Sequence, residues 1–153
     1  MTQARVSSVA TAEEMRDLGA RLGAVARAGD VIVLSGPLGA GKTTIAQGVG
    51  RGLGIAEPIT SPTFVIARVH TNPSSRPDLV HVDAYRLSSI AEVDDLELDA
   101  DLQQSVVVVE WGEGLVDGLS DSPLVVRIAR SDDEEDDVRR VELIFDDERW
   151  AST

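Results

Sequence analysis

The residues best suited to chemistry lie in one short stretch of the sequence. An apolar run, Val31 to Leu34, leads into Gly36-Pro37-Leu38-Gly39-Ala40-Gly41-Lys42-Thr43-Thr44, which fits the pattern G-x-x-x-x-G-K-[ST]. The pattern is typical of a strand, a phosphate-binding loop and the first turn of a helix, together called a P-loop. Ile45 to Val49 can continue as helix, which is the context that the pattern requires. The sequence therefore predicts a nucleotide phosphate site.

Each residue type in this loop has a physical reason. Glycine adopts backbone conformations that a Cβ would block, so successive N–H groups can point at phosphate oxygens beside the positive end of the helix. Lys42 is predicted to reach the β- and γ-phosphates as a catalytic residue, and the Thr43 hydroxyl to bind Mg²⁺. Pro37 removes one N–H donor. The residues predicted to bind nucleotide are Gly36, Leu38, Gly39, Ala40, Gly41, Lys42, Thr43 and Thr44.

A P-loop also needs a carboxylate that holds the metal shell or orients water, and two acids fit. Glu110 ends the run Val106 to Val109, and strand ends of this kind face the phosphate side of such a sheet. Asp83 lies within the run His81 to Leu87. Both are predicted to be catalytic, with Glu110 also a metal ligand, although either one could bind the metal directly and the other through water. The alternatives are a strand-terminal surface acid for Glu110 and a loop acid paired with Arg86 for Asp83.

Other side chains near these motifs carry weaker signals. His81 is expected to be a sheet-surface residue rather than a catalytic base. Trp111 is expected either to pack against the nucleotide or to fill the core at a strand end. Ser61 and Thr63 resemble a switch loop that senses a γ-phosphate.

Elsewhere the pattern predicts a compact alternation of strands and helices. Thr11 and Glu14 form a capping box before a helix, which Gly19 and Gly23 are expected to weaken. The glycines at 50, 52 and 54 are expected to break the helix that follows the P-loop. Short helices are expected within residues 88–102. The predicted strands cover residues 5–9, 31–35, 63–70, 79–85, 105–110, 124–129 and 138–145.

These elements predict one α/β domain over residues 1–153, with a single-domain P-loop NTPase fold. We expect a mixed, mainly parallel sheet flanked by helices, with an antiparallel pair at 63–85 and a C-terminal antiparallel hairpin. The continuous run Val106 to Val109 predicts a strand that is buried on both faces. The acidic connection at residues 132–137 is expected to be a solvated turn.

Composition limits the classes of function. The chain has 27 acidic and 14 basic residues, a net charge of −13, which argues against strong unaided nucleic-acid binding. The sequence has no cysteine, so disulfide and thiolate-metal chemistry are excluded. No apolar segment is long enough to span a bilayer, and the N-terminus lacks the apolar core of a signal peptide. A cytoplasmic protein without membrane association is expected.

Four stretches, in this order and spacing, resemble the TsaE (also YjeE) family of bacterial tRNA threonylcarbamoyladenosine biosynthesis ATPases. They are residues 36–44, 61–64, 81–87 and 110–113. The resemblance implies ATP and Mg²⁺ as ligands and slow hydrolysis by the isolated protein. It also implies TsaB and TsaD as partners, which install threonylcarbamoyl beside the anticodon of tRNAs reading ANN codons, with hydrolysis resetting that complex. It assigns phosphate and Mg²⁺ binding to Lys42 and Thr43, the metal site to Glu110 and an active-centre position to Asp83.

Two other functions remain open. One is a nucleotide-dependent binding module whose hydrolysis is incidental. The other is a small-molecule kinase, which usually needs an acceptor-binding insertion with several arginines, and no such cluster follows the P-loop helix.

Overall fold

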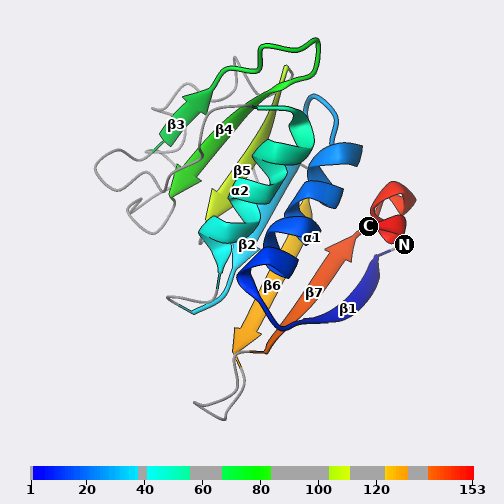
Figure 1. Ribbon diagram of the computed structural model, residues 1–153. Coiled ribbons are helices and arrows are strands. Elements are labelled where there is room, and N and C mark those ends of the chain that lie inside the picture. Colours follow the sequence, from blue (N-terminus) through cyan, green and yellow to red (C-terminus); the bar gives the residue numbers. More distant parts are fainter. Residues whose placement is uncertain (1, 38–40, 56–66, 84–103, 111–122, 131–137) are drawn as a thin grey trace.

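The computed structural model describes residues 2–37, 41–55, 67–83, 104–110, 123–130 and 138–153 (Figure 1). Within these ranges the chain alternates between strands and helices. The elements are β1 (Gln3–Val9), α1 (Ala12–Val25), β2 (Val31–Ser35), α2 (Lys42–Leu53), β3 (Ala67–His70), β4 (Asp78–Asp83), β5 (Ser105–Glu110), β6 (Leu124–Arg130), β7 (Arg139–Phe145) and the 3₁₀ helix η2 (Glu148–Ser152).

The strands form one sheet of seven in the order β1-β7-β6-β2-β5-β4-β3. Parallel pairing joins β4, β5, β2 and β6 at the centre, whereas β1 with β7, β6 with β7 and β3 with β4 are antiparallel. The predicted pair at 63–85 and the C-terminal hairpin are therefore confirmed where they are described. The expectation of a mainly parallel sheet is wrong for the described strands, because as many strand pairs are antiparallel as parallel.

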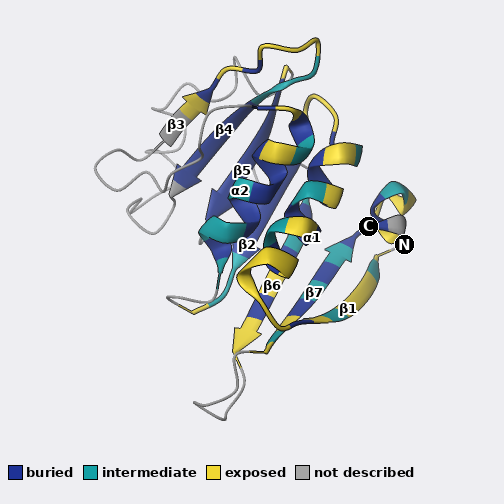
Figure 2. Ribbon diagram, in the orientation of Figure 1, coloured by how far each residue is buried: buried dark blue, intermediate teal, exposed yellow. Residues whose placement is uncertain are grey.

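Burial follows this topology. Every residue of β5 is buried, and β2 is buried except at Ser35 (Figure 2). Burial alternates along β6 and β7, as in strands with one covered face. The prediction of a doubly buried strand at β5 is confirmed.

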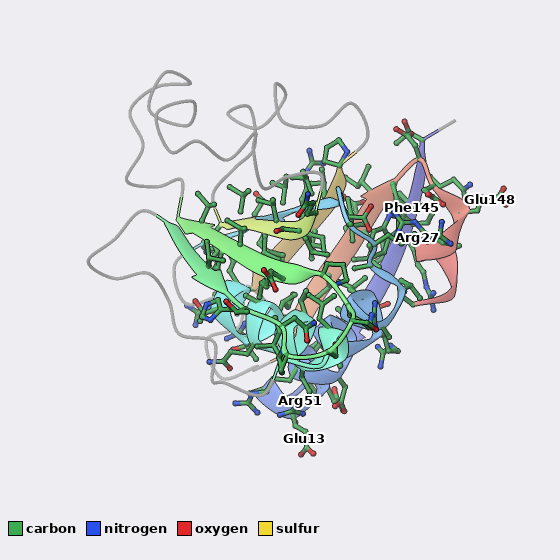
Figure 3. All side chains as sticks on the ribbon, turned by 90° about the horizontal axis from the view of Figure 1, so that it is seen from above. Glu13, Arg27, Arg51, Phe145 and Glu148 are labelled. Atoms are coloured by element: carbon green, nitrogen blue, oxygen red, sulfur yellow. The ribbon has the colours of Figure 1, made fainter. Side chains whose placement is uncertain are left out.

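Both described helices lie on the same face of the sheet, side by side (Figures 1 and 3). Ile32 and Leu34 of β2 join Leu22 of α1 and Ile45 of α2 in one core cluster. Seen from above, Glu13 of α1 and Arg51 of α2 point away from the sheet (Figure 3). None of the helices within the described ranges has the length and apolar character needed to cross a bilayer. The short helices expected at 88–102 and the acidic turn at 132–137 lie outside the described residues.

The predicted start of α1 is confirmed. The Thr11 hydroxyl accepts a hydrogen bond from the backbone N–H of Glu14 at 3.1 Å. The Glu14 carboxylate accepts in turn from the N–H of Ala10 at 2.8 Å. The Thr11 hydroxyl thus satisfies a donor that the helix leaves unpaired, and Glu14 reaches back to the residue before the N-cap, one residue further than in the standard capping box.

Glycines pack the two helices backbone against backbone. An added Cβ at Gly19 or Gly23 of α1 would lie 2.3 Å from a carbonyl oxygen of α2. At Gly48 or Gly52 of α2 it would lie 2.1 or 2.2 Å from a carbonyl oxygen of α1. Each pair is spaced by four residues, so the bare backbone forms one face of each helix. The glycines that lower helix propensity are thus the ones that permit close approach.

The expectation that glycines at 50, 52 and 54 break the helix after the P-loop is wrong for the first two positions. The glycines at 50 and 52 lie inside α2, and the helix ends only at Gly54, which has a φ of 92°. The N–H of Gly54 donates to the carbonyl of Arg51, closing the helix in the manner typical of glycine C-caps.

The Gly48→Ala variant tests this packing. Ala normally stabilises a helix by about 1 kcal/mol relative to Gly. Here the methyl group would meet the Arg16 carbonyl oxygen at 2.1 Å, so we expect the free energy of unfolding to fall by about 2 kcal/mol or more, because the helices must separate. Urea denaturation measures the change.

Arg51→Ala is the matched control, since Arg51 is exposed on the same helix, and its effect should stay within about 0.5 kcal/mol. An unchanged or higher stability of Gly48→Ala would contradict backbone contact between the helices.

The turn between β3 and β4 holds the C-terminal ends of both helices. The Arg76 guanidinium donates to the carbonyl oxygens of Gly23 at 3.1 Å, Ala26 at 2.9 Å and Gly52 at 3.2 Å. The Asn72 amide donates to the carbonyl of Leu53 at 2.8 Å. The last carbonyls of a helix lack intrahelical partners, so these bonds replace water and fix α2 on the sheet. The N-terminus of α2 is thereby held beside the ends of β2 and β5.

Candidate nucleotide-binding site

A strand precedes the glycine-rich motif and a helix follows it, as the sequence predicts. β2 ends at Ser35, and α2 begins at Lys42 after Gly41. Gly41 has a φ of 114°, a conformation that side chains with a Cβ rarely adopt. Of the predicted nucleotide-binding residues, Leu38, Gly39 and Ala40 lie outside the described residues.

The N-terminus of α2 suits an anion. Its N-cap residue, Gly41, has no side chain that could cap it, and its first turn contains no acidic residue. The first turn of a helix directs its unpaired N–H groups outward and carries the positive end of the helix dipole. Thr43 and Thr44 lie in this turn. A phosphate group placed here would meet backbone donors and favourable charge.

The Lys42 side chain reaches back to the residues that follow β2. Its Nζ donates to the carbonyl oxygens of Gly36 and Pro37, both at 2.9 Å, and the residue is 5% exposed. A buried ammonium group is stable only where acceptors replace water. These carbonyls hold the Lys42 charge at the loop, where phosphate oxygens are expected to bind.

Glu110 lies beside the same helix turn. It ends β5, pairs in register with Leu34 of β2 and is 5% exposed. The Thr43 hydroxyl donates to its Oε1 at 3.2 Å. An ionised carboxylate only accepts hydrogen bonds, so the hydroxyl hydrogen points at Glu110 and the Thr43 lone pairs point elsewhere. The surface-acid alternative for Glu110 is therefore wrong.

His81 lies at the candidate site, and sequence reasoning missed its placement. It was expected on the sheet surface, but it is fully buried, and its Nε2 lies 2.5 Å from Glu110 Oε2. β4 lies between β3 and β5, so His81 occupies an interior strand beside Val108. Its position between Val80 and Val82 was the available signal, since an apolar run of this kind favours a buried strand.

Asp83 shares this end of the sheet. It is the last residue of β4 and pairs in register with Glu110, so the two backbones are neighbours. Its side chain, like Arg86, Ser61, Thr63 and Trp111, lies outside what the structure describes. The alternative of an Asp83–Arg86 pair stays a prediction.

The groups gathered here fit a phosphate chain with a hard cation. Mg²⁺ prefers oxygen ligands, and the Thr43 hydroxyl and Glu110 carboxylate supply them at one point. The Lys42 ammonium and the first turn of α2 supply the positive groups that phosphates need. The donor chemistry is thus consistent with a magnesium nucleotide.

Comparison with known proteins gives the same family as the sequence motifs. The family model described as threonylcarbamoyl adenosine biosynthesis protein TsaE matches residues 9–141. A protein of Streptomyces coelicolor named tRNA threonylcarbamoyladenosine biosynthesis protein TsaE is 55% identical over 140 residues, which cover 90% of this chain and 95% of that protein. The protein of the same name from Bacillus subtilis is 39% identical over 127 residues, covering 82% of this chain and 78% of that protein.

A solved structure agrees in shape. The crystal structure of Bacillus subtilis YdiB superposes with a TM-score of 0.79 at 30% identity, covering 99% of this chain and 92% of that one. The family match covers most of the chain, including the strands and the helix that form the site described above. On these grounds, the chain belongs to the TsaE family.

Proposed function

We propose that this protein is a Mg²⁺-dependent ATP hydrolase with a single-domain P-loop NTPase fold. Its hydrolysis of ATP supports formation of threonylcarbamoyladenosine next to the anticodon of tRNAs reading ANN codons, by resetting a complex of TsaB and TsaD. The names of its relatives support the role in tRNA modification. The chemistry of the site supports the activity.

One observation carries the proposal. The Thr43 hydroxyl donates to the Glu110 carboxylate at 3.2 Å, at the N-terminus of α2 and one residue from Lys42. Two oxygen groups and one ammonium group converge from elements far apart in the sequence. This combination is what P-loop enzymes use to bind the phosphates and the metal of a nucleotide.

The residues divide the work as follows. Lys42 exchanges its bonds to the loop carbonyls for bonds to the β- and γ-phosphate oxygens, and its charge stabilises the phosphoryl group during transfer. The Thr43 hydroxyl would hold Mg²⁺ through its lone pairs, since its hydrogen is donated to Glu110. Glu110 completes the metal site, and Asp83 contributes a second carboxylate to the active centre. Mg²⁺, when bound, supplies positive charge against the phosphate oxygens.

The proposal also covers the partners of the protein and its location in the cell. A net charge of −13 disfavours tight direct contact with tRNA, so TsaB and TsaD, rather than this chain, are proposed to hold the nucleic acid. The protein is proposed to act in the cytoplasm and without a membrane.

Turnover in the presence of partners tests the function. ATP hydrolysis is measured with the purified protein alone and after addition of TsaB and TsaD, with and without tRNA. We expect slow hydrolysis alone and a rise with the partners. Lys42→Ala in the same mixture is the control for contaminating ATPase. Turnover that partners do not change would favour a nucleotide-dependent binding module instead.

A further inference from the structure

His81 is a buried polar residue without a part in the function proposed above. It is fully buried in β4, the strand next to the one that carries Glu110. Its Nε2 contacts Glu110 Oε2 at 2.5 Å, and the register places it opposite Val108, two residues before Glu110. A histidine in an interior strand is costly unless its ring nitrogens find partners.

The direction of this contact follows from the chemistry of the carboxylate. A carboxylate that binds a cation has no hydrogen to donate, so with Glu110 as the metal ligand proposed above, the hydrogen in the contact belongs to His81 Nε2. The other ring nitrogen is Nδ1. Among the described residues, Nδ1 has no hydrogen-bond partner. The polar contact that the described structure gives this ring therefore goes to Glu110 alone.

Two side chains from different elements contact this one carboxylate. His81 of β4 contacts Oε2 alone, whereas Thr43 of α2 lies 3.2 Å from Oε1 and 3.5 Å from Oε2. The terminal torsion of a glutamate is broad when nothing restrains it. The short contact with His81 is the one that distinguishes the two oxygens, so it restrains the rotation of the carboxylate and leaves Oε1 as the oxygen nearer to Thr43.

We propose that His81 is a positioning residue, which fixes the rotation of the Glu110 carboxylate through Nε2 and so presents it correctly to a Thr43-bound cation. The inference rests on the proposed function, since it takes Thr43 and Glu110 as the metal-binding pair. Groups that hold a metal-binding carboxylate matter for affinity nearly as much as the ligand itself.

The test compares two variants of His81 in the full chain. His81→Gln retains an N–H donor at nearly the reach of Nε2, whereas His81→Leu retains the bulk and loses the donor. Affinity for Mn²⁺ is measured by electron paramagnetic resonance in the presence of a non-hydrolysable ATP analogue. We expect His81→Leu to weaken Mn²⁺ binding by about 10- to 100-fold and His81→Gln to restore most of it. Binding of the analogue in EDTA should be unchanged in both variants.

His70 provides a matched control. It is also a buried histidine, 1% exposed, but it lies on β3 opposite Leu79, away from Glu110. His70→Leu is expected to lower stability as His81→Leu does, and to leave Mn²⁺ affinity unchanged. A double variant gives a second check: in a Glu110→Ala background, His81→Leu should cause no further loss, because its effect passes through the carboxylate.

Nitrogen NMR of the nucleotide-free protein supplies a readout that needs neither metal nor nucleotide. We expect His81 Nε2 to carry a hydrogen that exchanges slowly with water, because both partners are buried. An unprotonated Nε2 would overturn the proposal, as would wild-type Mn²⁺ affinity in His81→Leu or no recovery in His81→Gln. If His81→Leu does not fold, His81→Gln and the NMR signal still decide.

The proposed function and the positioning role of His81 would be contradicted by different results. A wild-type protein that binds neither the analogue nor Mn²⁺ would remove the proposed function, and the positioning role with it. A wild-type protein that binds both, together with a His81→Leu variant of equal Mn²⁺ affinity, would remove the positioning role alone.

Discussion

Lys42→Ala is expected to reduce ATP turnover by about 100-fold or more, because the variant removes a positive group directed at the transferring phosphoryl group. Lys42 has no substitute within the described site, where its ammonium bridges the carbonyls of Gly36 and Pro37. Initial rates of phosphate release at saturating ATP, with and without partners, measure the effect.

Arg51→Ala is the control for this experiment as well, since it removes an exposed positive charge from the same helix. Its turnover should match the wild type. Wild-type turnover in Lys42→Ala would show that this lysine does not contact the reacting phosphates, and the site would have to be assigned elsewhere.

Glu110→Gln is expected to lower Mg²⁺-dependent hydrolysis by about 100-fold, the cost typical of one lost electrostatic contact in the transition state. ATP binding should fall much less. Glutamine has nearly the same shape and keeps one oxygen, which can accept from either Thr43 or His81, the groups that contact Glu110 at 3.2 and 2.5 Å. What it lacks is the second acceptor oxygen and the negative charge.

Two measurements separate the outcomes for Glu110→Gln. Equilibrium binding of ATP is followed beside turnover, and the urea midpoint is compared with the wild type. An equal loss of binding and turnover, together with a lower midpoint, would indicate a folding defect rather than loss of a metal-site charge.

Much of the fold could be predicted from local patterns. The capping box at Thr11, the apolar run before the glycine loop and the run Val106 to Val109 each specify one element through nearby residues, and each is present in the structure. Hairpins were also predictable, because their two strands are neighbours in sequence. The balance of parallel and antiparallel pairs was not, since it depends on which distant strands pair.

The glycines show a second limit. Propensity alone counts Gly19, Gly23 and Gly52 as weak points in helices. The structure explains these glycines, because carbonyl oxygens of the facing helix occupy the space that a side chain would need. Helix propensity therefore predicts a break at these positions, whereas the packing of α1 against α2 requires glycine there.

The sequence likewise identifies some residues of the candidate site and not others. Lys42 and Thr43 belong to a motif with fixed spacing, so the sequence identifies them directly. Glu110 was a reasonable choice from its position at a strand end, and it lies within hydrogen-bonding distance of Thr43. His81 was missed because its neighbour Glu110 is 29 residues away, on a strand whose pairing with β4 has no local signature.

The backbone contact between α1 and α2 limits how these helices can move when a ligand binds. Helices separated by long side chains can shear past one another through small rotamer changes, whereas helices in main-chain contact would first have to lift apart. We therefore expect α2, which starts at the candidate phosphate site, to stay fixed against α1 when a ligand binds. Whatever motion accompanies the arrival or departure of a ligand has to originate outside this pair of helices.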